Sequence, residues 1–69
     1  MNAHYLGQLI QARRRELGIS QRDLSELSVV SLHSLSDIES GKGNPVLNTL
    51  LQILEPLGLE LTVQLRQLP

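Results

Sequence analysis

The sequence predicts a mainly α-helical domain of four to five helices, followed by one C-terminal β-strand. Over most of the chain, apolar residues recur three and four positions apart, which is the spacing of one face of a helix. The apolar content of 41% comes almost entirely from Leu, Ile and Val, with Tyr5 as the only aromatic residue, a composition that suits packed helices. Near the C-terminus the spacing changes to strict alternation, which is the period of a strand.

The first two helices are expected at 3–17 and at about 21–28. The apolar face of the first helix consists of Leu6, Leu9, Ile10 and Leu17. Gly18 stands just past its end as a stop. Ser20 and Asp23 resemble a capping box, in which the hydroxyl accepts a free N–H and the carboxylate lies near the positive helix end. The expected inward residues of the second helix are Leu24 and Leu27, joined by Ile19.

A third, short helix is expected between Ser31 as N-cap and Gly41 as left-handed C-cap. Leu35 and Ile38 share its inward face. The stretch 41–45 is a loop by composition. A fourth helix follows, which Pro56 disturbs in its last turn and Gly58 ends. Its apolar stripe consists of Leu47, Leu50, Leu51, Ile53, Leu54 and Leu57.

The segment 59–66 is the predicted strand. Its apolar residues are Leu59, Leu61, Val63 and Leu65, which alternate with Glu60, Thr62, Gln64 and Arg66. A lone strand in a helical chain has no ladder partner within the same molecule, so its free N–H and C=O groups favour pairing with another chain. We therefore expect a domain at 3–58 and a dimerisation strand at 59–66, paired with a second copy around a two-fold axis.

Length, composition and charge limit the possible functions. The 69 residues allow one compact domain, and without cysteine neither disulfides nor thiolate metal sites can support its small core. No apolar run approaches the ~18 residues of a membrane span, so we expect a cytoplasmic, nucleoid-associated protein. The net charge of -1 gives no general affinity for nucleic acid, yet four of the six basic residues lie within ten positions. These are Arg13, Arg14, Arg15 and Arg22, which form either a basic edge or an ordinary solvated surface.

Two short helices joined by a tight turn suggest a helix-turn-helix, although many small bundles contain such a pair as mere packing. The segments Leu17–Leu24, Val30-Ser31, Leu35–Lys42, Asn44-Pro45 and Leu47–Leu50 resemble the Cro/cI-type (XRE) helix-turn-helix family. The resemblance covers about residues 6–58 and implies a DNA-binding repressor with a Cro/cI-like (lambda repressor-like) fold. The continuation from Leu50 to Val63 resembles HipB-like antitoxins, which repress their own operon, dimerise partly through this strand and bind a HipA-like kinase toxin.

The resemblance also implies roles for single residues. The residues expected to read bases are Ser31, Leu32, His33 and Ser36. Those expected at the DNA backbone are Gln21, Arg13, Ser34, Lys42 and Asn44. Arg14 and Glu39 match a structural salt bridge between the first and third helices. Asp37 either accepts from a cytosine amino group or repels phosphate, and the sequence leaves both open.

Two departures from the family pattern affect these expectations. Glycine is common in the turn where this chain has Val29, and a β-branched residue resists positive φ, so we expect a turn with negative φ. The recognition helix has no Lys or Arg between Ser31 and Ser40. Tight binding therefore requires a homodimer on a palindromic operator.

Other functions fit less well. His33 and Asp37 are four apart, but a domain this small offers little concave volume for catalysis, so we expect no enzyme and no cofactor. His4 and His33 lack further ligands for a metal. The remaining alternatives are a protein-interaction module that neutralises a partner without reading DNA, and a stand-alone phage-type repressor. A kinase-like toxin gene beside this one would favour the antitoxin.

Overall fold

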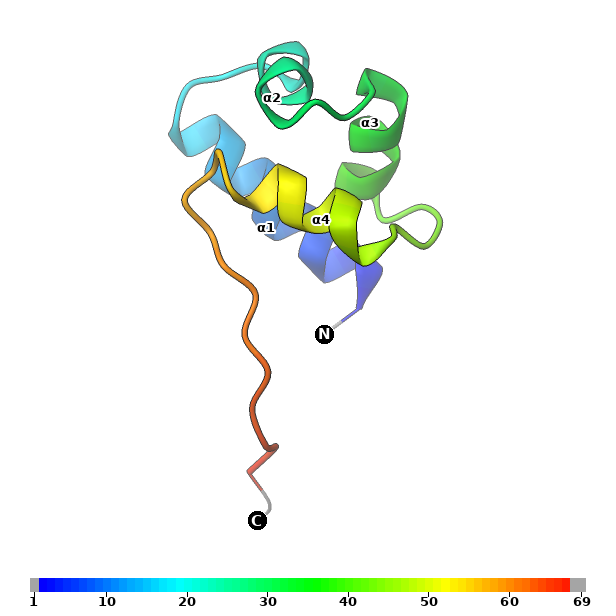
Figure 1. The fold of residues 1–69 in the computed structure, drawn as a ribbon, viewed down its shortest axis with the longest axis vertical. Helices are drawn as coiled ribbons and strands as arrows, with labels where there is room; N and C mark the ends of the chain where they lie inside the picture. The colour runs from blue at the N-terminus through cyan, green and yellow to red at the C-terminus, as the bar shows by residue number, and fades with distance from the viewer. Residues whose placement is uncertain (1, 68–69) are drawn as a thin grey trace.

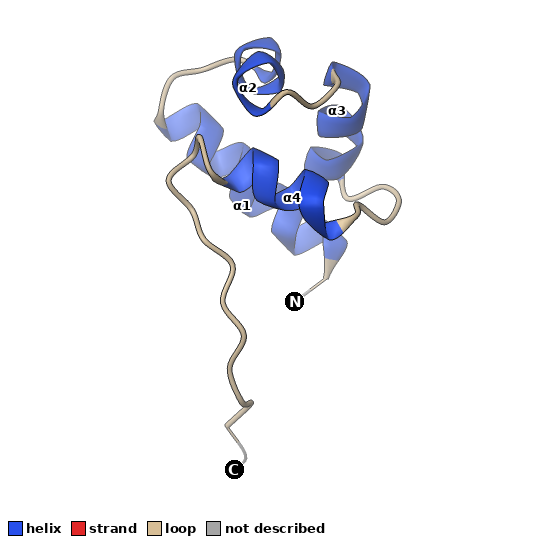
Figure 2. Ribbon diagram, in the orientation of Figure 1, coloured by secondary structure: helices blue, strands red, loops and turns tan. Residues whose placement is uncertain are grey.

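The computed structural model describes residues 2–67, which form four helices and an extended tail (Figure 1). The helices are α1 (Ala3–Glu16), α2 (Gln21–Ser28), α3 (Leu32–Ser40) and α4 (Leu47–Leu54). The tail leaves the end of α4 and runs away from the helices, and no strand is present within the described part of the chain (Figure 2). The four helices agree with the sequence, whereas the predicted strand is not seen in the described residues of this chain.

The first two helices begin and end close to the predicted positions, because their capping residues are local signals. The side chain of Asn2 accepts from the Tyr5 N–H at 2.8 Å, and Gly18 takes a φ of 72° just after α1. The capping box of α2 forms in both directions: Ser20 Oγ accepts from the Asp23 N–H at 3.0 Å, and Asp23 Oδ2 accepts from the Ser20 N–H at 2.9 Å.

The turn between α2 and α3 overturns one expectation. Val29 has a φ of 57° and a ψ of 39°, which is left-handed, so the predicted negative-φ turn is wrong. This conformation lets the Val30 N–H donate to the Ser25 carbonyl at 3.1 Å, the closure typical of a Schellman motif. Val30 is then buried in the core, while the side chain of Val29 is 82% exposed. The hydrogen bonds that close the end of α2 and the burial of Val30 therefore outweigh the preference of valine for negative φ.

The third helix is capped as expected, by Ser31 Oγ accepting from the Ser34 N–H at 3.1 Å and by Gly41 at a φ of 80°. The fourth helix is shorter than predicted: α4 ends at Leu54 and does not reach Leu57. Pro56 lacks an N–H and cannot continue the ladder. The chain turns there through a bond from the Leu57 N–H to the Leu54 carbonyl at 3.1 Å.

One core joins all four helices. Its buried apolar side chains are Ile10, Leu24, Val30, Leu35, Ile38, Leu50, Ile53, Leu54 and Leu57. Leu27 was expected to point inward, but it is 62% exposed, because the short α2 turns Leu24 and Ser28 toward the core. Gly7 lets α1 approach α3 so closely that an added Cβ would lie 2.6 Å from the Glu39 carbonyl oxygen.

The tail is extended but unpaired. Leu59 is half-buried against the core, whereas Val63 and Leu65 are 97% and 96% exposed. A strand needs a neighbour for its N–H and C=O groups, and the described residues of one chain supply none. None of the helices in residues 2–67 has the length and hydropathy to span a bilayer.

Candidate nucleic-acid interface

The third helix has one face in the core and one in solvent. Leu35, Ile38 and Glu39 point inward and are buried. Leu32, His33 and Ser36 are exposed, in the half of the helix that follows Ser31. The structure thus brings the four residues expected to read bases to one free surface. Their hydroxyl, imidazole and apolar groups can meet base edges and a thymine methyl.

The two serines at the start of this helix are partly occupied by capping. The hydroxyl of Ser31 accepts from the Ser34 N–H and donates to Ser34 Oγ at 2.9 Å. Ser31 is exposed and Ser34 half-buried. An oxygen accepts through two lone pairs, so both hydroxyls keep capacity for a further partner.

His33 and Asp37 form a pair on the exposed face of α3. Nε2 of His33 lies 3.4 Å from Oδ2 of Asp37, and the two side chains are 88% and 41% exposed. A protonated imidazole in this position would neutralise the charge of the carboxylate. The contact agrees with the spacing of four residues between them, which places both side chains on one face of the helix.

A buried polar network holds α3 against α1 and α2. Nε and Nη2 of Arg14 donate to the two carboxylate oxygens of Glu39 at 2.7 and 3.0 Å, and Nη1 donates to the Ile19 carbonyl at 2.9 Å. Hydrogen bonding to Glu39 and its negative charge raise the pKa of Arg14, against the opposing effect of burial. Gln21 Nε2 also donates to Glu39, at 3.1 Å. Gln21 thus positions α2, and its second amide hydrogen stays available to a phosphate.

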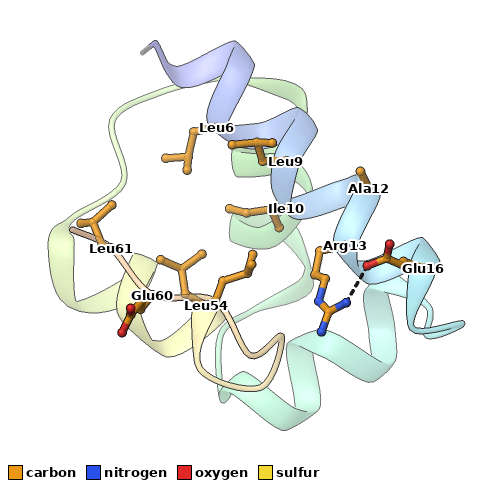
Figure 3. Close-up of a pocket in the computed structure, with 10 residues that line it drawn as sticks. Leu6, Leu9, Ile10, Ala12, Arg13, Glu16, Leu54, Glu60 and Leu61 are labelled. Atoms are coloured by element: carbon orange, nitrogen blue, oxygen red, sulfur yellow. Dashed lines mark hydrogen bonds and ion pairs between the residues drawn. The ribbon is translucent and has the colours of Figure 1, made fainter. Parts of the chain in front are cut away.

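Arg13 lies elsewhere. Its Nε donates to the Leu57 carbonyl at 2.9 Å, and its Nη1 pairs with Glu16 (Figure 3). These bonds hold the guanidinium at the junction between α1 and the end of α4. Its position next to Arg14 in sequence turns Arg13 to a different side of the helix, and its expected contact with the DNA backbone stays a prediction.

The loop after α3 forms a second part of the surface. Lys42 and Asn44 are exposed and line a hollow of about 260 Å³ together with Ser34, Asp37 and Thr49. The N-cap of α4 is Val46, whose side chain makes no cap hydrogen bond, so the first-turn N–H groups of this helix receive no side-chain cap. Val46 lines the same hollow as Lys42. Sequence reasoning did not include Thr49 or the start of α4 in this surface. The signal for the uncapped helix start was Val46, an apolar residue at an N-cap position where Ser, Thr, Asp or Asn is usual.

Comparisons with known proteins agree with this geometry. A helix-turn-helix family model matches residues 10–64. An uncharacterised HTH-type transcriptional regulator of Haemophilus influenzae is 48% identical over 50 residues, which are 72% of this chain and 51% of the relative. The chain therefore spans about half the length of that curated relative.

Two solved structures share the fold. The restriction-modification controller protein C.AhdI of Aeromonas hydrophila has a TM-score of 0.79 and 28% identity, covering 84% of this chain and 88% of the controller. The clp gene regulator ClgR of Corynebacterium glutamicum has a TM-score of 0.75 and 30% identity, covering 81% of this chain and 60% of the regulator. The family consists of DNA-binding regulators and not of enzymes, as the sequence predicted. The chain belongs to the Cro/cI-type (XRE) helix-turn-helix family of transcriptional regulators.

Proposed function

We propose that this protein is a sequence-specific transcriptional repressor that lays α3 in the major groove of its own operator. The observation that carries the proposal is the free outer surface of α3, where Leu32, His33 and Ser36 are all exposed. In the helix-turn-helix mode, the first residues of the second helix of the motif contact base edges. Specificity then comes from Ser31, Leu32, His33 and Ser36 through hydrogen bonds and an apolar contact.

Backbone contacts set the register of the helix on the duplex. The proposed donors are the remaining amide hydrogen of Gln21, the hydroxyl of Ser34, and the side chains of Lys42 and Asn44. Lys42 adds a cation to the hollow at the uncapped N-terminus of α4, a combination that suits a phosphate. These contacts hold the protein in place without distinguishing sequences.

The proposal includes a homodimer. The recognition helix carries no Lys or Arg, so one copy neutralises few phosphates and binds weakly. Two copies joined through the segment 59–66 place two α3 helices on half-sites about 34 to 36 Å apart. The exposed alternating tail supports this, since its unpaired backbone can form a ladder with the same segment of a second copy.

We further propose the antitoxin role, in which the repressor also binds a HipA-like kinase toxin encoded beside it. Its support is the resemblance of residues 50–63 to HipB-like antitoxins. Co-expression with the product of a neighbouring kinase-like gene tests this step. A stable complex that strengthens operator binding supports the role, whereas an unaltered gel-filtration profile leaves a stand-alone repressor.

Operator binding is tested by fluorescence anisotropy with DNA from upstream of the gene, in a salt series, with scrambled DNA of equal length as control. We expect the specific complex to be at least ~10³-fold tighter than the scrambled one. Equal affinity for both DNAs, or binding of the kinase without any DNA binding, would make the chain an interaction module. Removal of residues after Gly58 should give a monomer in sedimentation, and a truncated chain that stays dimeric excludes the tail as the main interface.

A further inference from the structure

An apolar groove lies where the tail leaves the helices. It has a volume of about 300 Å³ and lies between α1 on one side and the end of α4 with the start of the tail on the other (Figure 3). Its apolar lining consists of Leu6, Leu9, Ile10, Ala12, Leu54, Leu59 and Leu61. Leu9 and Leu61 remain 42% and 41% exposed at its rim, so this chain alone does not fill it.

We propose that the groove and the tail together form one self-complementary interface, in which the tails of two copies pair antiparallel with Val63 opposite Val63. The inference rests on the proposed homodimer and adds its register, its charge pairs and the place of the groove. The register follows from the order of residues in the tail, because residues directly opposite in an antiparallel pair share one face.

Only an even shift keeps apolar residues opposite apolar ones, because a shift by one turns one tail over. With Val63 opposite itself, Leu61 lies opposite Leu65 and Glu60 lies opposite Arg66. By symmetry each of these pairs occurs twice. The register with Thr62 opposite itself sets Glu60 against Gln64, and the one with Gln64 opposite itself sets Arg66 against Thr62. Charge complementarity therefore selects the register centred on Val63.

The same register fills the groove. Two antiparallel strands related by a two-fold axis perpendicular to their ribbon show their odd-numbered residues on the same side. In this chain Leu59 and Leu61 supply the apolar part of the groove that comes from the tail, and Glu60 borders it as well. The partner's Leu65, opposite Leu61, therefore lies over the rim formed by Leu9 and Leu61. In the proposed ribbon Glu60 and Arg66 fall on the face opposite to Leu59 and Leu61. Glu60 borders the groove in this chain but is exposed, as is Arg66, so their ion pair needs no burial.

Cysteine cross-linking tests the register, because the native chain has no cysteine. Thr62 lies opposite Gln64, so a mixture of T62C and Q64C chains should form a disulfide dimer on oxidation, while either variant alone should not. Diagonal neighbours are about 7 to 8 Å apart, beyond the reach of a disulfide. Efficient self-linking of T62C or of Q64C would overturn the register, and sedimentation that still shows a dimer would leave the proposed homodimer standing.

A charge exchange tests the same pairs without cross-linking. E60R places Arg opposite Arg66 twice, and R66E places Glu opposite Glu60 twice, so each should raise the dimer dissociation constant about tenfold at low salt. Mixing the two variants restores both pairs in the heterodimer and should recover the native value. E55R is the matched control for E60R, since Glu55 is exposed at the end of α4 and both variants replace one glutamate by arginine.

The outcomes separate the two proposals. Recovery in the mixture, with no effect of E55R, supports the register. Equal weakening in E60R, R66E and their mixture overturns it. If L9S leaves the dimer dissociation constant unchanged while circular dichroism shows a folded chain, the groove contact is overturned. If the native chain is a monomer in sedimentation and still saturates operator DNA, tail pairing is overturned altogether, whereas the proposed reading of DNA by α3 still stands.

Discussion

The guanidinium of Arg14 in α1 is bound to both carboxylate oxygens of Glu39 in α3, at 2.7 and 3.0 Å, with both side chains in the interior. Gln21 at the start of α2 donates to the same carboxylate. Three helices therefore meet at one buried charge pair. This pair orients α3, since its geometry is satisfied only when the three helix positions are all correct.

Removing one member of this pair should strongly destabilise the fold. R14M leaves Glu39 buried without its cation, and we expect a loss of about 3 to 5 kcal/mol in the free energy of unfolding. The double variant R14M/E39L should recover most of that loss, because two apolar side chains replace two charges. Urea denaturation of both single variants and the double variant measures this coupling. Additive losses would contradict it.

Gly7 should tolerate no side chain. A Cβ there would meet the Ile38 and Glu39 carbonyls of α3, and neither belongs to a flexible side-chain end. We expect G7A to lower the free energy of unfolding by about 1 to 3 kcal/mol, although alanine is the better helix former. Thermal denaturation measures the change, with Q8A on the exposed side of α1 as control. A stabilised G7A would show that the helices are less closely packed.

Replacing Val29 by glycine should make the domain more stable. The left-handed conformation of Val29 costs an L-residue roughly 1 to 2 kcal/mol, and its exposed side chain contributes little packing in return. Glycine removes this strain, but its greater freedom in the unfolded state offsets part of the gain. We therefore expect V29G to raise the free energy of unfolding by about 1 kcal/mol at most, measured by chemical denaturation. V29A, which keeps Cβ but loses the branch, should gain less. A destabilised V29G would point to a contact of the valine side chain.

The capping carboxylate should make stability depend on acid. The N–H and hydroxyl of Ser20 hydrogen-bond Asp23 and lower its pKa. The contribution of a carboxylate with a lowered pKa is complete above the unfolded value of about 3.9 and disappears as the pH falls through the folded value. D23A should thus be less stable than the native chain at pH 7, and the difference should shrink below about pH 4. A constant difference at all pH values would contradict this.

The base-reading role of His33 has its own signature. H33A should weaken binding to the specific operator by about 1 to 3 kcal/mol and leave binding to random DNA nearly unchanged. K42A, as the contrasting variant, should weaken both DNAs alike and reduce the salt dependence. Anisotropy titrations on both DNAs measure these changes. Equal loss on random DNA would exclude His33 as a base reader.

The sequence alone predicted the parts of this protein that depend on local chemistry. Ser20, Ser31 and Gly41 mark helix ends through side-chain oxygens or a permitted positive φ, so the starts of α2 and α3 and the end of α3 could be read directly. The motif around these caps also led to the correct family. Pro56 signalled a disturbance, but the apolar stripe continuing to Leu57 favoured a longer helix than the three-dimensional structure contains.

Only the tertiary structure decided the rest, because it depends on which distant groups compete for the same space or partner. Val29 accepts a strained φ because Val30 gains a place in the core. Arg13 points to the Leu57 carbonyl, an acceptor 44 residues away that no local pattern reveals. The sequence therefore determined the helix ends and, through the family resemblance, the pair of Arg14 and Glu39. Packing decided the conformation of Val29 and the acceptor of Arg13.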